Sequence, residues 1–478
     1  MALWLCLDFP ALALEVFQHN GADSLPRVVI EDGRVHTANR AAIRSGIQSG
    51  MRLTAARALV PSLHCRERDS AAEGRALRQL AGWALQFTHQ VCLQPPHGLL
   101  LEIGGSLRYF GGLTALYRDI QVQVAGLGYT SIPAVAPTPM AAWLLAHGGR
   151  ATTVTSPCDI DDALAGLPVT VLPIPAHQLE ALSDLGCRTV GDCLALPREG
   201  LARRFGHHLI RHLDRARGRL PDPRRCWQPP PRYNAEIALA LETREIDPLL
   251  AAIERLLLEL CGYLRGLESG VQRLQLRFDH HPRGATALTV GLLSPSRKPD
   301  HLLTLVRNQL ECTSLDAAAH SIALTARDIR SLIPENGTLL PTPAASTGTA
   351  WQPLVERLSA RLGEQTIHGL HPRAEHRPEY AWDYAAPGES SATPAESAPE
   401  RPLWLLKPPR RLATAGEQPL WHGPLTMERG PERIETGWWD GDDVARDYYI
   451  ACNDHGERLW IYRERRAPQA WFLHGLFA

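Results

Sequence analysis

The stretch LWLCLDFPALALEVF, residues 3–17, carries the most decisive pattern in the chain. Leucine occupies every second position of its first half, and this period of two predicts a β-strand whose other face is made of Trp4, Cys6 and Asp8. A strand that delivers an acidic residue at its end is typical of a metal centre, yet the residue two places before Asp8 is a cysteine. The stretch therefore predicts half of an acidic site, followed by a short helix.

The composition is that of an ordinary globular protein. The chain has 478 residues, of which 44% are hydrophobic and 21% charged, and its formal net charge is −1. This length allows several domains, and a near-neutral charge does not exclude DNA binding, because local patches decide that. The ten cysteines form no Cys-x-x-Cys pair, and no apolar run approaches the length of a membrane span. We therefore expect reduced thiols and a cytoplasmic location.

The rest of the first 170 residues alternates between strand and helix patterns. Residues 27–60 contain a hairpin-like segment and a small helical region. A helix is predicted at residues 74–90, and LLLEI at 99–103 reads as a buried strand. The sequence therefore predicts a mixed α and β body in this part of the chain.

Residues 174–217 are predicted to form a helix-hairpin-helix, with a turn at Gly186 and a second helix that begins near Thr189. Such hairpins present backbone N–H groups and a helix N-terminus to a phosphate. A plain helical hairpin with a solvated basic face explains the pattern equally well, and the sequence leaves both readings open. The residues assigned to DNA contact are Gly186, Arg188, Thr189, Arg203 and Arg204.

The most regular part of the chain is residues 234–328, where strand and helix patterns follow in the order β-α-β-β-α-β. In the first strand Ile237, Leu239 and Leu241 are expected to point inward. Both helices would cover one face of the sheet and leave the other open. An open face with arginines suits a phosphate backbone, and an ordinary solvated face is the alternative. The arginines assigned to that face are Arg273, Arg277 and Arg327.

The composition changes after residue 330. Residues 351–363 predict a short helix, and the Pro-, Ser-, Ala- and Glu-rich stretch 385–402 predicts a disordered linker. A small module at 403–478 contains a β-hairpin with its turn at 454–456. Its many aromatic side chains either build the core or, where exposed, form a partner interface. Those assigned to partner binding are Trp438, Trp439, Tyr448, Trp460, Trp471, Phe472 and Phe477.

In this order the pieces resemble the Y-family translesion DNA polymerases over about residues 1–330, which implies a multidomain α+β fold. The C-terminal module continues beyond that resemblance. The implied domains are a palm and fingers at 1–170 (fingers about 21–70), a helix-hairpin-helix thumb at 171–230, a little-finger DNA-binding domain at 232–330, a clamp-peptide loop with a short helix at 331–384, the linker at 385–402 and a β-rich partner-binding module at 403–478.

The same resemblance places most of the family's metal-binding carboxylates on other residue types. The first acidic ligand of the opening strand falls on a cysteine, and the catalytic Asp-Glu pair of the second motif falls on PPHGLLLE, residues 95–102. The replaced positions are Cys6, His97 and Gly98, and the carboxylates that remain are Asp8, Glu15 and Glu102. The positions aligned with the family's triphosphate-binding residues are Arg40, Ile43 and Pro139.

These replacements bear directly on the chemistry. Two-metal phosphoryl transfer needs carboxylates that hold two Mg²⁺ ions about 3.5–4 Å apart, and a thiol, a glycine and a histidine do not supply the hard oxygen ligands that Mg²⁺ requires. We therefore expect no metal, no cofactor and no enzymatic activity. An active polymerase that uses Asp8 and Glu102 in a rearranged site is the alternative.

The C-terminal text, GPERIETGWWDGDDVARDYYIACNDHGERLWIYRE and onward from residue 430, resembles the tail of the ImuB-type proteins, as does LVERLSARLG at 354–363. These are catalytically inactive Y-family relatives of the bacterial DNA-damage (SOS) response. The resemblance implies a nucleoid-associated mutasome subunit that binds damaged or primer-template DNA. The implied protein partners are a sliding clamp, an ImuA-like RecA-related protein and an error-prone C-family DNA polymerase.

One motif departs from this pattern. Clamp-binding peptides of such proteins typically read Gln-x-x-Leu-Phe, whereas the corresponding stretch here is NGTLLP. Asn336, Leu339 and Leu340 would form a degenerate clamp-binding site, and an ordinary loop is the alternative. A scaffold that binds proteins but no longer DNA is a third possibility for the whole chain, and the basic residues of the hairpin and the sheet argue against it.

Overall fold

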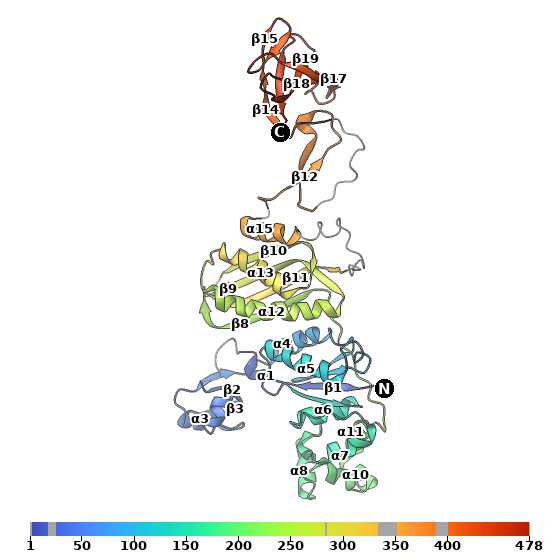
Figure 1. Ribbon diagram of the computed structural model, residues 1–478. Helices are drawn as coiled ribbons and strands as arrows, with labels where there is room; N and C mark the ends of the chain where they lie inside the picture. The colour runs from blue at the N-terminus through green and yellow to red at the C-terminus, as the bar shows by residue number, and fades with distance from the viewer. Residues whose placement is uncertain are drawn as a thin grey trace. The chain divides into compact units, whose positions relative to one another are not determined.

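The computed structural model describes residues 2–17, 25–282, 284–332, 351–363, 365–388 and 400–477. The chain divides into two compact units, residues 1–361 and 362–478, whose elements are labelled in Figure 1. No helix in the described part of the chain is long and apolar enough to cross a lipid bilayer. The predicted clamp peptide (Asn336, Leu339 and Leu340) and most of the predicted linker lie outside the described residues.

The first unit is built on an antiparallel sheet in the order β5-β6-β1-β7, which we call the palm sheet. Helices α4 and α5 cover its leucine-rich face and α6 covers the other, as Figure 1 shows. Both faces are buried because β1 is apolar on both sides, as the opening stretch predicts. The elements are β1 (Trp4–Asp8), α1 (Leu12–Glu15), α4 (Ser70–Ala84), β5 (Val91–Gln94), β6 (Gly98–Glu102), α5 (Leu113–Gly126), β7 (Ile132–Ala136) and α6 (Pro139–His147).

A small second sheet in the order β3-β2-β4 occupies the segment predicted as the fingers. The predicted hairpin is confirmed, but β4 pairs in parallel with β2 and was not predicted. Its sequence HCRE has no apolar alternation, so nothing in the local pattern signals a strand. The elements are β2 (Arg27–Glu31), β3 (Arg34–Ala38), α2 (Arg40–Arg44), α3 (Leu53–Leu59) and β4 (His64–Glu67).

Short helices continue from α6 and share its core. The predicted turn at Gly186 is confirmed, with a positive φ of 82° that favours glycine. A second such turn, at Gly206, joins the last two helices. These thumb helices and the two 3₁₀ turns before them are η1 (Pro157–Asp159), α7 (Ile160–Ala165), η2 (Val169–Val171), α8 (Ala176–Asp184), α9 (Val190–Ala195), α10 (Arg198–Phe205) and α11 (His207–Ala216).

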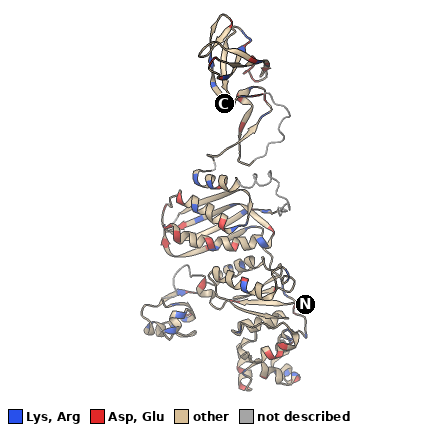
Figure 2. Ribbon diagram, in the orientation of Figure 1, with Lys and Arg blue, Asp and Glu red and all other residues tan. Residues whose placement is uncertain are grey.

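The predicted β-α-β-β-α-β order is confirmed in the next segment, whose sheet has the order β10-β9-β11-β8. Both helices pack on one face of this little-finger sheet, and Figure 2 shows acidic and basic residues mixed along them. The elements are β8 (Tyr233–Thr243), α12 (Ile246–Gly266), β9 (Ser269–His280), β10 (Ala285–Ser296), α13 (Pro299–Glu311) and β11 (Ala319–Ser331).

One expectation for β8 is wrong. Ile237 is buried and Leu239 half-buried, but Leu241 is 81% exposed. The pairing of β8 with β11 shifts register between the partners of Ala319 and Ser321, so the alternation that faces the core does not extend to the end of the strand.

The little-finger segment is packed against the palm through α12 and α4. A side chain at Gly262 would meet the Trp83 ring at 2.7 Å, and one at Gly266 would meet the Leu85 Cβ at 2.3 Å. Only glycine therefore lets the two helices approach so closely. Helix α15 (Gln352–Leu362) closes this unit, because the buried Glu356 carboxylate accepts a hydrogen bond from Leu293 N at 2.8 Å and pairs with His301 Nε2 at 2.7 Å.

The second unit centres on an antiparallel sheet in the order β14-β20-β19-β18-β17, and the predicted hairpin forms β18 and β19. Residues 365–388 belong to this unit, whereas residues 365–384 were predicted to precede the linker and residues 385–388 to lie within it. The elements are β12 (Gly369–Pro372), η3 (Pro378–Tyr380), β13 (Trp382–Ala385), β14 (Trp404–Arg411), β15 (Ala413–Ala415), β16 (Gln418–Leu420), β17 (Thr426–Thr436), β18 (Val444–Cys452), β19 (Arg458–Glu464) and β20 (Trp471–Leu476).

Candidate functional site

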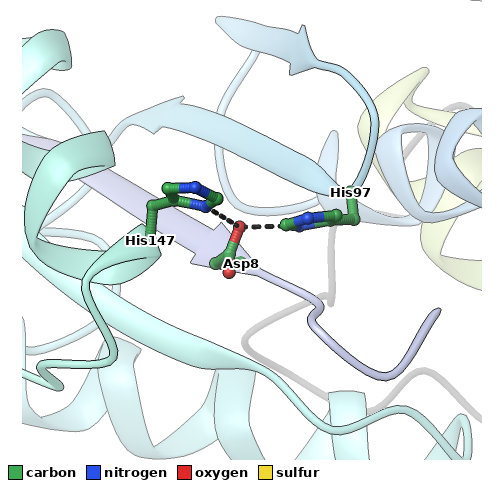
Figure 3. A group of neighbouring side chains, drawn as sticks. All are labelled: Asp8, His97 and His147. Carbon is green, nitrogen blue, oxygen red and sulfur yellow. Dashed lines mark hydrogen bonds and ion pairs between the residues drawn. The ribbon is translucent and has the colours of Figure 1, made fainter. Parts of the chain in front are cut away.

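Asp8 lies at the end of β1, opposite Gly98 of β6, and is 2% exposed. Its carboxylate is met by two histidines rather than by other carboxylates (Figure 3). His97 comes from the turn before β6, with its Nδ1 2.9 Å from Asp8 Oδ1. His147 is the last residue of α6, with its Nδ1 3.8 Å from the same oxygen. Asp8 and His97 were predicted from the sequence as positions of this site, but His147 was not.

The two histidines lower the pKa of the Asp8 carboxyl. Burial alone would raise the pKa of the Asp8 carboxyl, but the contact from His147, the hydrogen bond from His97 and the charge of these rings hold that pKa below its ordinary value. The hydrogen bond to Asp8 raises the pKa of His97, against the effect of burial. The two imidazoles therefore compensate a carboxylate that would otherwise be buried without a partner.

Cys6 does not take part in this group. Its side chain is fully buried in the apolar core between the palm sheet and α6. Burial, and then the nearby Asp8 charge, raise the pKa of its thiol well above the ordinary value. A buried neutral thiol is a small apolar side chain, and metal binding requires the thiolate.

Glu102 lies at the opposite end of the palm sheet from Asp8. In the β1–β6 register Asp8 faces Gly98, and Glu102 faces Trp4. Four residues of strand separate the two positions by about 13 Å, and the Glu102 carboxylate accepts hydrogen bonds from Leu3 N and Gly104 N at 3.1 Å each. The alternative in which Asp8 and Glu102 share a rearranged metal site is therefore wrong.

The other aligned positions have structural or surface roles. The Glu15 carboxylate is buried and accepts hydrogen bonds from Thr130 N at 3.0 and 3.1 Å. Arg40 is exposed at the start of α2, Ile43 is 58% exposed, and Pro139 is buried in the first turn of α6.

The backbone N–H groups of the thumb hairpin donate hydrogen bonds within the chain. The backbone N–H groups of Arg188 and Thr189 both donate to the Asp192 carboxylate, at 2.9 and 2.8 Å, and Asp192 N donates to Thr189 Oγ1. The hydrogen bond from Thr189 leads the interactions that lower the Asp192 pKa. Gly186 N donates to Ser183 O. These backbone groups already have partners within the chain, so a phosphate would have to replace those hydrogen bonds. The assignment of Gly186, Arg188 and Thr189 to DNA contact stays a prediction, and it rests on the exposed Arg188 side chain.

The other basic residues of the thumb are better placed. Arg203 and Arg204 are exposed in the last turn of α10, and neither has an acidic partner among the described residues. The next helix, α11, begins at His207, and its N-cap residue Gly206 provides no side-chain cap. By contrast, Arg198 is bound to Asp214 at 2.7 Å. Arg203 and Arg204 therefore remain available to an external anion.

The open face of the little-finger sheet carries the predicted arginines. Arg273 and Arg277 are exposed on β9, and Arg327 is exposed at an irregularity of β11. Arg277 is 3.2 Å from Asp279, and this neighbour offsets part of its charge. Arg273 and Arg327 have no acidic partner within the described parts of the chain.

The aromatic residues of the C-terminal unit separate into two groups. Tyr448 and Trp460 are 1% and 2% exposed and stack at 4.2 Å in the core, so the prediction that they contact a partner is wrong. Trp471, Phe472 and Phe477 are half-buried. The two remaining residues, Trp438 and Trp439, are exposed.

Trp438 and Trp439 are 80% and 58% exposed on the turn between β17 and β18. Their rings meet edge to face, with centroids 5.5 Å apart. Arg377, which is itself buried, bonds to Asp440 at 2.7 Å and to the Asp442 carbonyl at 3.0 Å, and so fixes the turn. The sequence analysis missed Arg377 because it lies 63 residues from Asp440.

The chain is similar to known proteins in its sequence and in the order of its elements. A model of the impB/mucB/samB family matches residues 7–147. Among solved structures the chain is similar to a Dbh ternary complex, with 18% identity and a TM-score of 0.38, and to DinB from Sulfolobus solfataricus, with 16% identity and a TM-score of 0.39. Each match covers 69% of this chain and 100% of the other. The family match and the element order define a Y-family polymerase-like protein of the α+β class with a separate β-rich C-terminal sheet.

Relatives that match along most of the chain identify the family within this class. Protein ImuB of Caulobacter vibrioides, from strains NA1000 / CB15N and ATCC 19089 / CIP 103742 / CB 15, is 30% identical in an alignment 458 residues long that covers 90% of this chain and 100% of that protein. The chain belongs to the ImuB family.

Proposed function

We propose that this protein is a non-catalytic adaptor of damage-induced translesion synthesis, which binds primer-template DNA and recruits the proteins that copy it. The observation that carries the proposal is the group around Asp8, whose carboxylate is met by two imidazoles and, among the described residues, by no second carboxylate. Two Mg²⁺ ions need several hard oxygen ligands within a few ångströms. Of the other retained carboxylates, Glu102 lies at the far end of the sheet and Glu15 accepts hydrogen bonds from Thr130 N.

DNA binding is assigned to side-chain arginines. Arg203 and Arg204 of the thumb, and Arg273 and Arg327 of the little-finger sheet, are exposed and free of acidic partners in the described structure. Guanidinium groups bind phosphate oxygens in a planar fork, and each phosphate contact adds to the salt dependence of binding.

Recruitment is assigned to the C-terminal unit and to the segment before it. Trp438 and Trp439 form a rigid exposed pair, and exposed tryptophans are enriched at the centres of protein interfaces. We assign this pair, together with the half-buried Trp471, Phe472 and Phe477 of the same unit, to the ImuA-like protein and the C-family polymerase. The degenerate peptide Asn336, Leu339 and Leu340 is assigned to the sliding clamp.

Primer extension and DNA binding test the first half of the proposal. The purified full chain should incorporate no nucleotide with Mg²⁺ or Mn²⁺, and should bind primer-template DNA with an affinity that falls steeply with salt. The double variant Arg203→Glu and Arg204→Glu should weaken binding by tenfold or more, a rough expectation for two lost phosphate contacts and two added like charges. The matched control is Arg118→Glu, at an exposed arginine of α5 outside the predicted DNA-binding positions. Incorporation that Asp8→Ala abolishes would overturn the proposal.

A pull-down tests the second half. Trp438→Ala with Trp439→Ala should reduce capture of the ImuA-like protein and the polymerase by about tenfold or more, as expected for central tryptophans of an interface. Because both rings are exposed, this variant should keep the thermal stability of the parent. Trp382→Ala, at another exposed tryptophan of the same unit, is the control. Undiminished capture by the double variant would remove the pair from the interface.

A further inference from the structure

One group of metal-binding side chains remains unexplained by the adaptor role. Asp8, His97 and His147 bring one ligand atom each to within 4.8 Å of one another, and no other such group occurs among the residues that the structure describes. The three side chains come from β1, from the turn before β6 and from the end of α6, and they converge on one point (Figure 3).

We propose that Asp8, His97 and His147 bind a single divalent transition-metal ion of the Zn²⁺ type at the end of β1. Two imidazole nitrogens and one carboxylate oxygen suit Zn²⁺, Co²⁺ or Ni²⁺ and are poor ligands for Mg²⁺, which takes oxygen donors. Three protein ligands leave one tetrahedral position for water. This proposal amends the expectation from sequence that the site holds no metal, and it does not depend on the adaptor function.

The distances fit a small tetrahedral ion. With metal–ligand bonds of about 2.0–2.1 Å, neighbouring ligand atoms in a tetrahedral site lie about 3.3 Å apart. The observed distances to Asp8 Oδ1, 2.9 Å from His97 and 3.8 Å from His147, lie on either side of that value. Each of these two distances would need to change by about half an ångström, which is within ordinary side-chain motion. The two imidazole nitrogens, which lie within 4.8 Å of one another, would also have to approach to about 3.3 Å.

The surroundings hold the ligands and leave a path for the ion. The His147 ring stacks on Trp143 with centroids 5.2 Å apart and an angle of 12° between the planes. The His97 carbonyl accepts a hydrogen bond from Phe9 N at 2.8 Å, which fixes the turn beside β1. The side chain of Asp8 is 4% exposed, while those of His97 and His147 are 26% and 35% exposed. The Asp8 carboxylate is therefore the buried part of the site, and the two imidazoles form its solvent-exposed side.

A bound ion would have a structural effect rather than a catalytic one. It would tie together three elements of the palm that the chain otherwise joins through the His97–Asp8 hydrogen bond and the longer contact from His147. Because the ion would bind the folded arrangement and not the separated ligands, it should raise the unfolding temperature in proportion to the logarithm of its concentration.

Cobalt titration of the chelator-treated full chain tests the site. Co²⁺ should bind with visible d–d absorption, Zn²⁺ should displace it, and millimolar Mg²⁺ should not. His147→Ala should weaken Co²⁺ binding by at least about tenfold, as loss of a ligand or its support does elsewhere. His177→Ala, at an exposed histidine of α8, should leave it unchanged. Equal Co²⁺ affinity for wild type and His147→Ala, or displacement by Mg²⁺ as effective as by Zn²⁺, would overturn the proposal.

A second measurement does not depend on the folding of a variant. Crystals of the wild-type chain soaked in zinc chloride should show an anomalous difference peak at the zinc edge between Asp8, His97 and His147. Zinc peaks found solely at other residues would show that the three side chains prefer their direct ion pair, and would also overturn the proposal.

Discussion

At the scale of single residues, polar groups in this protein are largely satisfied from within the chain. The Asp8 carboxylate is hydrogen-bonded to His97, and the Asp192 carboxylate accepts hydrogen bonds from the N–H groups of the hairpin. The Glu102 carboxylate accepts a hydrogen bond from Leu3 N, just before the N-terminal strand. His474 of the C-terminal unit departs from this tendency. It is fully buried and its Nδ1 is 2.9 Å from the Tyr448 hydroxyl, but its Nε2 has no hydrogen-bond partner among the described residues.

His474 should make the C-terminal unit sensitive to acid. Burial lowers the pKa of its imidazole, an effect that the Glu379 charge opposes and the Arg446 and Lys407 charges reinforce. The unfolded chain, with an ordinary histidine pKa of about 6.5, therefore binds the proton more readily than the folded one. The stability that the neutral ring contributes is fully present above pH 6.5 and falls as the pH drops from there toward the folded pKa, by about 1.4 kcal/mol for each pH unit that separates the two pKa values.

Hydrogen exchange of the full chain checks this prediction. Protection factors of the β18 and β19 amides should decrease between pH 7 and pH 5, after correction for the intrinsic exchange rate. In His474→Gln the same interval should produce a smaller change, because the titrating group is gone. The exposed His455, on the turn between the two strands, provides a control as His455→Gln. An identical pH profile in wild type and His474→Gln would contradict the assignment.

At the scale of elements, the contact between α12 and α4 depends on glycine. Replacing Gly266, the last residue of α12, by alanine places a Cβ 2.3 Å from the Leu85 Cβ and 2.7 Å from its carbonyl carbon. One of the two helices must then shift, and we expect a loss of about 1–3 kcal/mol, as for other overpacked contacts. A Cβ added at Gly126, the last residue of α5, would have nothing within 4 Å, so Gly126→Ala is the matched control.

Urea unfolding followed by tryptophan fluorescence measures this difference, because Trp83 and Trp227 lie at the contact. Gly266→Ala should lower the midpoint, and Gly126→Ala should leave it unchanged or raise it slightly through better helix propensity. Equal midpoints for the two variants would show that α12 and α4 are not packed in solution as they are here.

The elements themselves follow from the sequence more fully than their contacts do. Period-two and period-3.6 patterns predicted β1, the little-finger order and the β18–β19 hairpin, because those elements carry regular apolar repeats. Strand β4 and the register of β8 were missed, because their pairing is decided by distant strands. Likewise Asp8 and His97 were predicted positions of the candidate site, but His147 is far along the chain and only the fold brings it to Asp8.

At the scale of the whole molecule, the division at residues 361 and 362 predicts which fragment is stable. A chain that ends at residue 361 keeps α15 docked through Glu356, so it should unfold in one transition and bind DNA as tightly as the full chain, within about twofold. It should capture neither the ImuA-like protein nor the polymerase.

A chain that ends at residue 400 should behave differently. It would keep residues 365–388 but lose Asp440, so the buried Arg377 would have no Asp440 carboxylate to bind. We expect proteases to trim this fragment back toward residue 361. Resistance of the 400-residue fragment to limited proteolysis, together with lability of the 361-residue one, would place the boundary elsewhere.

If the proposed function holds, the closed hairpin at Asp192 has a consequence for the kind of nucleic acid that Arg203 and Arg204 would bind. Backbone amides are rigid, and a site built from them accepts phosphates at one spacing. Guanidinium groups at the ends of long flexible side chains, such as those of Arg203 and Arg204, follow a strand whose sugars and phosphates are irregular. Binding through flexible side chains tolerates distorted DNA geometry. The affinity for abasic or crosslinked templates should therefore equal the affinity for intact ones.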